Sequence, residues 1–210
     1  MRWHIGFWLI GLFVGMLALP IIFTQELVMK RVGTEIGYLT NAFGEQDAKT
    51  IVDGANSFFD DWFVKTGIIS SLGKAYAVDE NKDRTEKILG QTVNKLTGAT
   101  NSYVMSFAAN IYAMTLRVNI LLTWAVYILP FLGAAIVHGF VKRKIKILSF
   151  GYVSPSAYGI ALHSIIALTF FPLLYLLAPF AITPLFMPFW AMVLSVPVIM
   201  MMSNIQRING

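Results

Sequence analysis

The charged residues of this chain leave three long gaps, and these gaps constrain the fold more than any motif does. Residues 3–25, 118–141 and 147–206 contain no Asp, Glu, Lys or Arg. A helix that crosses a bilayer needs roughly 20 mainly apolar residues, so the first two gaps suit one crossing each and the third suits two. The whole sequence is 57% hydrophobic and 13% charged, whereas soluble domains carry about 25% charged residues. We therefore predict an integral membrane protein.

The third gap is divided by a segment that contains two prolines, Ala178 to Pro184. Prolines at this density predict a tight turn between two helices. We expect the first span to be a retained anchor, because Ala18-Leu19-Pro20 is a poor signal-peptide cleavage site. The four expected spans lie near residues 5–24, 118–141, 157–178 and 185–204.

The positions of the charges predict an orientation in the membrane, where the outside of a Gram-negative inner membrane would be the periplasm. All 11 acids lie between Glu26 and Glu86, and the bases without nearby acids flank the spans: Arg2, Arg117, Lys142, Arg143, Lys144, Lys146 and Arg207. Short loops rich in Lys and Arg stay in the cytoplasm. We therefore expect both termini and a basic loop at 142–156 to be cytoplasmic and residues 25–116 to be periplasmic. Arg117 is the exception, since it would lie outside.

The expected fold class is all-α, a polytopic membrane protein with four transmembrane helices and a helical extracytoplasmic domain between spans one and two. The expected parts are 1–24, 25–116 and 117–210. Helical apolar spacing in the middle part predicts a helix near 26–43 (Leu27, Val28, Ile36, Leu39, Phe43), an aromatic helix over 51–63 that Lys65-Thr66-Gly67 stops, and a helix near 81–97. The polar stretch Ala77–Arg84 reads as a solvated loop tip or a partner contact.

The sequence contains few residues or motifs that are typical of an enzyme active site. Without cysteine there are no disulfides and no thiolate metal sites, and neither a phosphate-binding loop nor a Gly-x-Ser-x-Gly elbow is present. We therefore expect no enzyme activity, cofactor or metal. His163 lies inside the expected third span, where an ionisable group is a functional candidate. A neutral imidazole that makes a hydrogen bond is one reading, and proton transfer or metal binding is the other.

Several residues are candidates for interactions. Gly11, Gly15 and Gly133 offer small helix faces for packing within the bundle or against the spans of another protein, or of a second copy. Trp62 belongs to either the core or an interface. The basic residues Lys142, Arg143, Lys144 and Lys146 would attract lipid headgroups or contact an acidic partner, and four charges do not argue for direct nucleic-acid binding.

Several short motifs resemble one known family. They are His138 to Lys146, Phe150 to Tyr158 with His163, Glu35-Ile36-Gly37-Tyr38-Leu39, and Trp62 to Gly67. In these the chain is similar to small inner-membrane proteins of integrating conjugative elements and conjugative plasmids, a four-span family linked to type IV secretion coupling. His138 and Val153 depart from that pattern, since acids often occupy both positions.

The resemblance implies a non-enzymatic component of a conjugative type IV secretion apparatus, which docks the coupling ATPase or the channel subunits. Two other hypotheses remain open from the residues themselves. One is a small transporter or channel, and the other is an entry-exclusion factor that acts in recipient cells.

Overall fold

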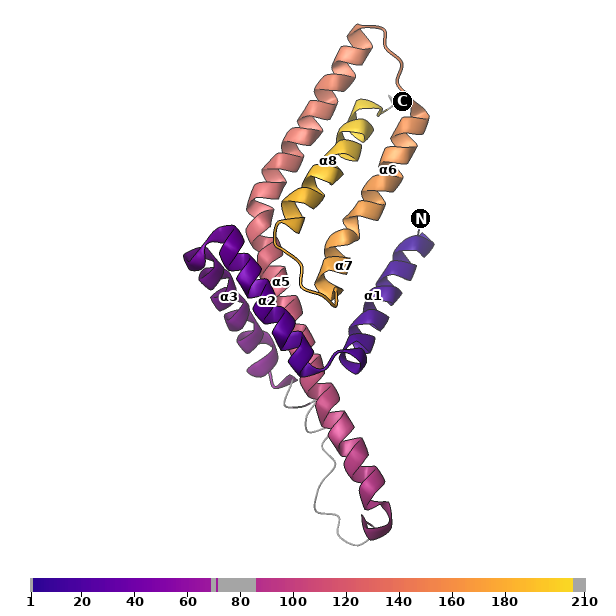
Figure 1. Cartoon of the computed structure of the whole chain (residues 1–210). Coiled ribbons are helices and arrows are strands. Elements are labelled where there is room, and N and C mark those ends of the chain that lie inside the picture. The colour runs from indigo at the N-terminus through magenta and orange to yellow at the C-terminus, as the bar shows by residue number, and fades with distance from the viewer. Residues whose placement is uncertain (1, 69–70, 72–85, 206–210) are drawn as a thin grey trace. The chain divides into compact units, whose positions relative to one another are not determined.

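The computed structural model describes the backbone of residues 2–68, 71 and 86–205, and the side chains of these residues apart from 2–5, 7, 8, 12 and 86–101. Every regular element within these ranges is a helix, and no strand occurs there. The helices are α1 (Arg2–Ile22), α2 (Gln25–Phe43), α3 (Glu45–Phe59), the π-helix η1 (Asp60–Val64), α5 (Glu86–Leu148), α6 (Pro155–Thr169), α7 (Phe171–Leu177) and α8 (Phe186–Ser203) (Figure 1).

The chain forms two compact units. Unit 1 comprises Met1–Asn119 together with the short segment Leu176–Ile182, and unit 2 comprises Ile120–Tyr175 and Thr183–Gly210. Helix α5 belongs to both units, because it runs without interruption from Glu86 to Leu148. From Glu86 onward, the expected helix at 81–97 is therefore the start of α5 rather than a separate element. The polar stretch 77–84 lies outside the described residues.

In unit 1, α2 and α3 form a helical hairpin (Figure 1). The two helices are separated by Gly44 alone, whose φ of 85° lies in the left-handed region. Glycine adopts this conformation without the steric cost that a Cβ imposes. The Gly44 amide still donates to the Thr40 carbonyl at 2.9 Å. The turn therefore pairs a carbonyl of the last turn of α2 while it reverses the direction of the chain.

The helix that we expected near 26–43 is confirmed, and its buried face includes the expected Val28 and Leu39 but not Leu27. The structure buries positions separated by three or four residues: Val28, Arg31, Val32, Glu35 and Leu39. Leu27, which we placed on the apolar face, is 54% exposed. Two charged residues thus occupy positions that apolar spacing would assign to the core. The opposing face of α3 buries Ala48, Ile51 and Ala55.

The aromatic helix is longer than expected and changes its pitch near its end. It begins at Glu45 and passes into η1, where the Lys65 amide donates to the Asp60 carbonyl five residues earlier, at 2.8 Å. Gly67 has a φ of 73° and the chain leaves the helix there. The stop that Lys65-Thr66-Gly67 predicts is therefore confirmed.

Unit 2 is built around the contact between α6 and α8 and the second half of α5. Its core centres on Ala135, Leu194 and Val198, with partly buried apolar side chains from the same helices around them. Gly139 of α5 lies against α8 so closely that a Cβ there would stand 2.5 Å from the Met202 Cβ and 3.0 Å from the Ile199 carbonyl oxygen. Only glycine permits this close approach of two helices.

A tryptophan side chain supplies a hydrogen-bond donor at the helix break between α6 and α7. Pro172 has no amide hydrogen, so the Leu168 carbonyl four residues earlier loses its helical donor. The Trp190 Nε1–H of α8 donates to that carbonyl at 2.8 Å. In an apolar environment an unpaired carbonyl is costly, so this bond allows the break and also ties α8 to α6.

Three helices are long and apolar enough to cross a membrane, namely those at Ser102–Leu148, Pro155–Leu177 and Phe186–Ser203. A fourth crossing is present only if Leu9–Ile22 and Gln25–Phe43, which meet at 109°, are counted as one bent span. These lengths agree with three of the expected spans, and residues 178–185 between the last two are non-helical, as the prolines predict. The orientation of the termini stays a prediction.

Candidate interaction sites

The most elaborate polar arrangement of the described chain is a buried ion pair in unit 1. Arg117 of α5 and Glu35 of α2 are 0% and 1% exposed at their side chains. The Arg117 Nε–H lies 3.2 Å from both Glu35 carboxylate oxygens, and Nη2 donates to Oε1. Guanidinium and carboxylate groups held at two points in this way form some of the strongest hydrogen bonds in proteins.

The same cluster also binds the backbone of the segment that joins α7 to α8. Arg117 donates from Nη1 to the carbonyl oxygens of Leu176 (3.2 Å) and Ala178 (2.7 Å), and from Nη2 to that of Phe180 (2.8 Å). Arg31 adds a bond from its Nη1 to the Ala178 carbonyl at 3.2 Å. Non-helical backbone away from water needs such donors, so the two arginines satisfy carbonyls that the break after α7 leaves without helical partners.

This cluster corrects our interpretation of Arg117, which we counted as a cation that flanks a span on the outside. It is instead fully buried and paired with an acid 82 residues earlier. A signal for the pair was present in the sequence. Glu35 lies four residues before Leu39 on the face that α2 buries, and an acid at a core position predicts a buried cationic partner.

The aromatic end of α3 and η1 is divided between core and surface. Phe59 packs edge-on against Tyr112 of α5, with ring centroids 5.4 Å apart. Phe58 and Trp62 stack on each other but are 43% and 61% exposed. The interface reading therefore fits Trp62, and the core reading fits Phe59. Beside Trp62, Lys65 donates to Asp61 at 2.6 Å, and this hydrogen bond raises the pKa of the Lys65 amine.

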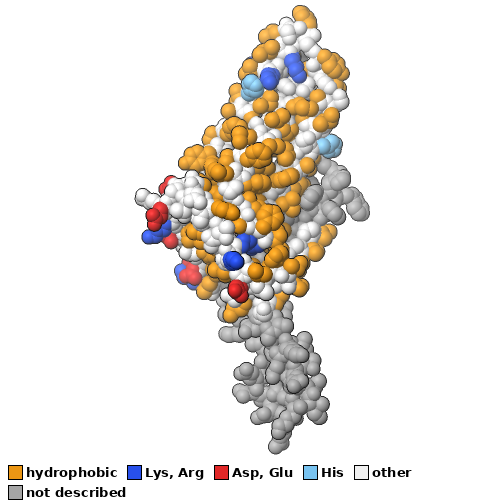
Figure 2. Space-filling view, in the orientation of Figure 1, with side chains coloured by type: hydrophobic (Ala, Val, Ile, Leu, Met, Phe, Trp, Pro, Cys, Tyr) orange, Lys and Arg blue, Asp and Glu red, His pale blue; other side chains and the backbone are white. Residues whose placement is uncertain are grey.

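The basic residues of unit 2 lie on a helix, not in the loop that we expected at 142–156. Helix α5 continues to Leu148, and α6 begins at Pro155. Lys and Arg are good helix formers, so nothing in the basic stretch itself ends the helix. Lys142 and Lys144 are exposed, whereas Arg143 and Lys146 are partly buried. Hydrophobic side chains cover much of the surface near these cations (Figure 2).

One buried amide fixes this end of unit 2. The Asn204 side-chain oxygen accepts from the Lys146 Nζ at 3.0 Å and from the Ser154 backbone amide at 3.2 Å. Its Nδ2 donates to the Met200 carbonyl at 2.8 Å. Asn204 thus joins the end of α5, the start of α6 and the end of α8.

The candidate glycines have different surroundings. Gly139 is covered by α8, and a Cβ at Gly15 would contact only the Leu177 Cδ1, at 3.5 Å. A Cβ at Gly11 or at Gly133 would meet nothing within 4 Å. Gly15 therefore packs within unit 1, while the Gly11 and Gly133 positions leave open helix faces.

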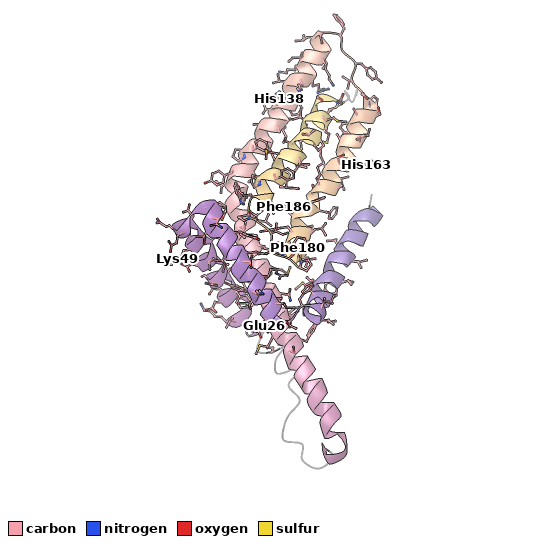
Figure 3. All side chains as sticks on the ribbon, viewed as in Figure 1. Glu26, Lys49, His138, His163, Phe180 and Phe186 are labelled. Atoms are coloured by element: carbon pink, nitrogen blue, oxygen red, sulfur yellow. The ribbon has the colours of Figure 1, made fainter. Side chains whose placement is uncertain are left out.

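The histidines form no site among the described residues. His138 on α5 and His163 on α6 are both exposed (Figure 3). No group of three or more His, Cys, Asp or Glu side chains in the described ranges could hold a metal ion. The described geometry therefore consists of packing faces, charges and exposed aromatic groups.

Comparison with known proteins connects this architecture to DNA transfer. A family model described as "IncC plasmid conjugative DNA transfer protein DtrJ-like" matches residues 24–206. The motifs at Glu35–Leu39, Trp62–Gly67 and 138–146 all lie within that range, so the match confirms the resemblance to proteins of conjugative elements. No curated protein and no solved structure matched the chain. Because the match covers most of the sequence, the chain belongs to the DtrJ-like family of conjugative DNA transfer proteins.

Proposed function

We propose that this protein is a non-enzymatic inner-membrane component of a conjugative type IV secretion apparatus, where it docks the coupling ATPase or the channel subunits. The family match over residues 24–206 carries this proposal. The three long apolar helices support a membrane location. The interaction surfaces described above support a docking role, since docking requires exposed, shaped faces rather than a reactive centre.

A stripe on α5 is suited to the docking of a partner's transmembrane helix. Val126, Leu129 and Val137 are 69%, 68% and 62% exposed, and Gly133 lies between them at helical spacing. A glycine at the centre of an apolar stripe lets a second helix approach closely, and van der Waals packing then stabilises the pair. We propose that a span of the coupling ATPase or of the channel packs on this stripe.

Affinity purification from donor membranes and a mating assay test the proposal together. The tagged protein is expected to recover secretion components, and Gly133→Leu is expected to reduce both this recovery and the transfer frequency about tenfold or more. Gly159→Leu is the matched control, because a Cβ at Gly159 also meets nothing within 4 Å. Recovery of no secretion component by the unaltered protein would contradict the docking role.

Deleting the gene separately in donor and in recipient cells tests the place of action. A loss of transfer that follows donor deletion alone supports a role in the apparatus. An increase in transfer into recipients that lack the gene would instead indicate an entry-exclusion factor. Flux through proteoliposomes that depends on His163 would favour a transporter and overturn the docking proposal.

A further inference from the structure

The end of α5 in unit 2 combines cationic and apolar side chains without any acid. No Asp or Glu occurs after Glu86 in the sequence, so the cations of unit 2 have no acidic partner within that unit. The most exposed neighbours are apolar or aromatic: Leu148 is 80% exposed, Phe150 is 99% exposed and Tyr152 is 78% exposed. We call this surface the basic–aromatic cap, and it comprises Lys142, Arg143, Lys144, Lys146, Leu148, Phe150 and Tyr152.

Phe150 occupies a backbone position that normally belongs to glycine. The Gly151 amide donates to the Lys146 carbonyl at 2.6 Å, and the Phe150 amide lies 3.4 Å from the Ile147 carbonyl. This pair of bonds is a Schellman motif, whose left-handed residue is usually glycine. Here the residue with positive φ, 52°, is Phe150, and the glycine comes one position later. A bulky residue at positive φ is a genuine outlier.

The strain at Phe150 has no compensating contact within unit 2, because its side chain is 99% exposed. Glycine at position 150 would adopt this backbone conformation at a lower energy. The turn therefore carries a conformational cost, and its aromatic ring is exposed. Departures from local preference of this kind concentrate at functional sites. The cap is therefore a candidate binding surface rather than a simple loop.

We infer that the basic–aromatic cap binds anionic phospholipids, with Lys142 and Lys144 contacting the phosphates and Leu148, Phe150 and Tyr152 lying among the headgroups. The inference rests on the membrane location that the proposed function includes. The cap lies at the end of a helix that is long enough to span a membrane, and its lysines directly follow the charge-free stretch 118–141, beyond which headgroups are expected. Basic residues beside exposed aromatic ones are typical of the membrane interface, and the charge is opposite to that of the lipid.

Native mass spectrometry of the full chain in detergent, titrated with phosphatidylglycerol or phosphatidylcholine, tests this inference. The unaltered protein is expected to retain phosphatidylglycerol in preference. Lys142→Gln with Lys144→Gln is expected to weaken this binding about thirtyfold, which corresponds to about 2 kcal/mol at about 1 kcal/mol for each lysine. Lys30→Gln with Lys49→Gln removes two exposed lysines of unit 1 and is the matched control, with no expected change.

Phe150→Gly separates binding from folding, because glycine suits the left-handed position and the variant is expected to fold at least as well. Its affinity for phosphatidylglycerol is expected to fall about tenfold, since the ring no longer leaves water. Equal retention of the two lipids, or unchanged binding by Phe150→Gly, would overturn the inference. So would tighter binding of soluble poly-glutamate than of phosphatidylglycerol, which would assign the cap to an acidic protein. If the protein remains in carbonate-washed membranes but fails these tests, lipid binding by the cap is disproved while the membrane location stands.

Discussion

The two units hold distant parts of the chain together by different chemistry. In unit 1 the long-range contacts converge on buried ions, where Arg117 joins Glu35 to the backbone at Leu176 and Phe180. In unit 2 they rely on small and apolar side chains, with Gly139 against α8 and the neutral amide of Asn204 at one end. Buried ion pairs contribute little net stability because desolvation opposes the attraction, but they are intolerant of losing one partner. Close apolar packing is instead sensitive to volume. We therefore expect removal of a buried charge to destabilise unit 1, and an increase in side-chain volume to destabilise unit 2.

The largest effect is expected from Glu35→Gln, which leaves the Arg117 charge buried without its carboxylate. An uncompensated buried charge costs about 3–5 kcal/mol. Thermal unfolding of the full chain in detergent measures the loss. The double variant Glu35→Met with Arg117→Met removes both charges, and we expect it to be more stable than Glu35→Gln. A double variant that is the less stable of the two would show that the ion pair and the Arg117 bonds to the backbone carbonyls together outweigh the cost of burying the charges.

Gly139→Ala tests the packing of unit 2. The new Cβ would overlap with Met202, and overpacking of this kind costs about 1–3 kcal/mol. Gly133→Ala is the matched control on the same helix, because its Cβ meets nothing within 4 Å. Since alanine is the better helix former, this control is expected to gain about 0.5–1 kcal/mol. The comparison fails if the two alanine variants change the unfolding temperature in the same direction.

Trp190→Phe tests the hydrogen bond that Trp190 donates at the helix break before α7. The substitution keeps an aromatic ring but removes the donor to the Leu168 carbonyl, and we expect a cost of about 1–2 kcal/mol. Amide hydrogen exchange would report faster opening near residue 172. Phe189→Leu alters the neighbouring exposed side chain and should be close to neutral. Equal stability of Trp190→Phe and the unaltered protein would mean that water satisfies this carbonyl.

Phe150→Gly is expected to stabilise unit 2 by about 1 kcal/mol, because glycine adopts positive φ without strain. Phe150→Ala keeps the strain while it removes the ring, so it separates the backbone effect from the loss of the side chain. A lower unfolding temperature for Phe150→Gly than for Phe150→Ala would contradict this account.

The smallest effect is expected at the exposed pair of unit 1. Asp61→Asn replaces the carboxylate that raises the Lys65 pKa with a neutral amide, so that pKa should fall toward its ordinary value. Because the folded-state pKa is raised, any stabilisation from the pair is present at neutral pH and is lost as the pH rises through that pKa. At neutral pH the variant should unfold at the same temperature within error. NMR titration of the Lys65 amine checks the direction of the shift.

Features set by local sequence could be predicted well. The helix near 26–43, the stop at Gly67 and the proline-rich turn after residue 177 all depend on neighbours in the chain, and all three are present. Three of the expected spans were also recognisable, because length and apolar content decide them. Only residues 149–154 of the expected basic loop at 142–156 are non-helical, for an equally local reason, since a run of basic residues lets a helix continue.

Features set by pairing across the chain could not be predicted in the same way. Counting charges made Arg117 look unaccompanied, whereas its partner Glu35 lies in another helix. Apolar spacing placed Phe58 and Trp62 on the same stripe as the buried Ile51, but they are 43% and 61% exposed. The sequence alone does not distinguish Gly133 from Gly139. They differ because α8 packs against Gly139 and leaves Gly133 uncovered.

The ion cluster of unit 1 also sets an order of events during synthesis. Arg117 and Glu35 can pair once both have left the ribosome, but Phe180, whose carbonyl completes the cluster, is made 63 residues after Arg117. At roughly 5–20 residues per second this interval is about 3–13 s. During it the Arg117 guanidinium lacks the backbone acceptors that it has in the complete fold. Synthesis of the segment that follows α7, rather than of α8, is thus the event that supplies the last acceptors of unit 1.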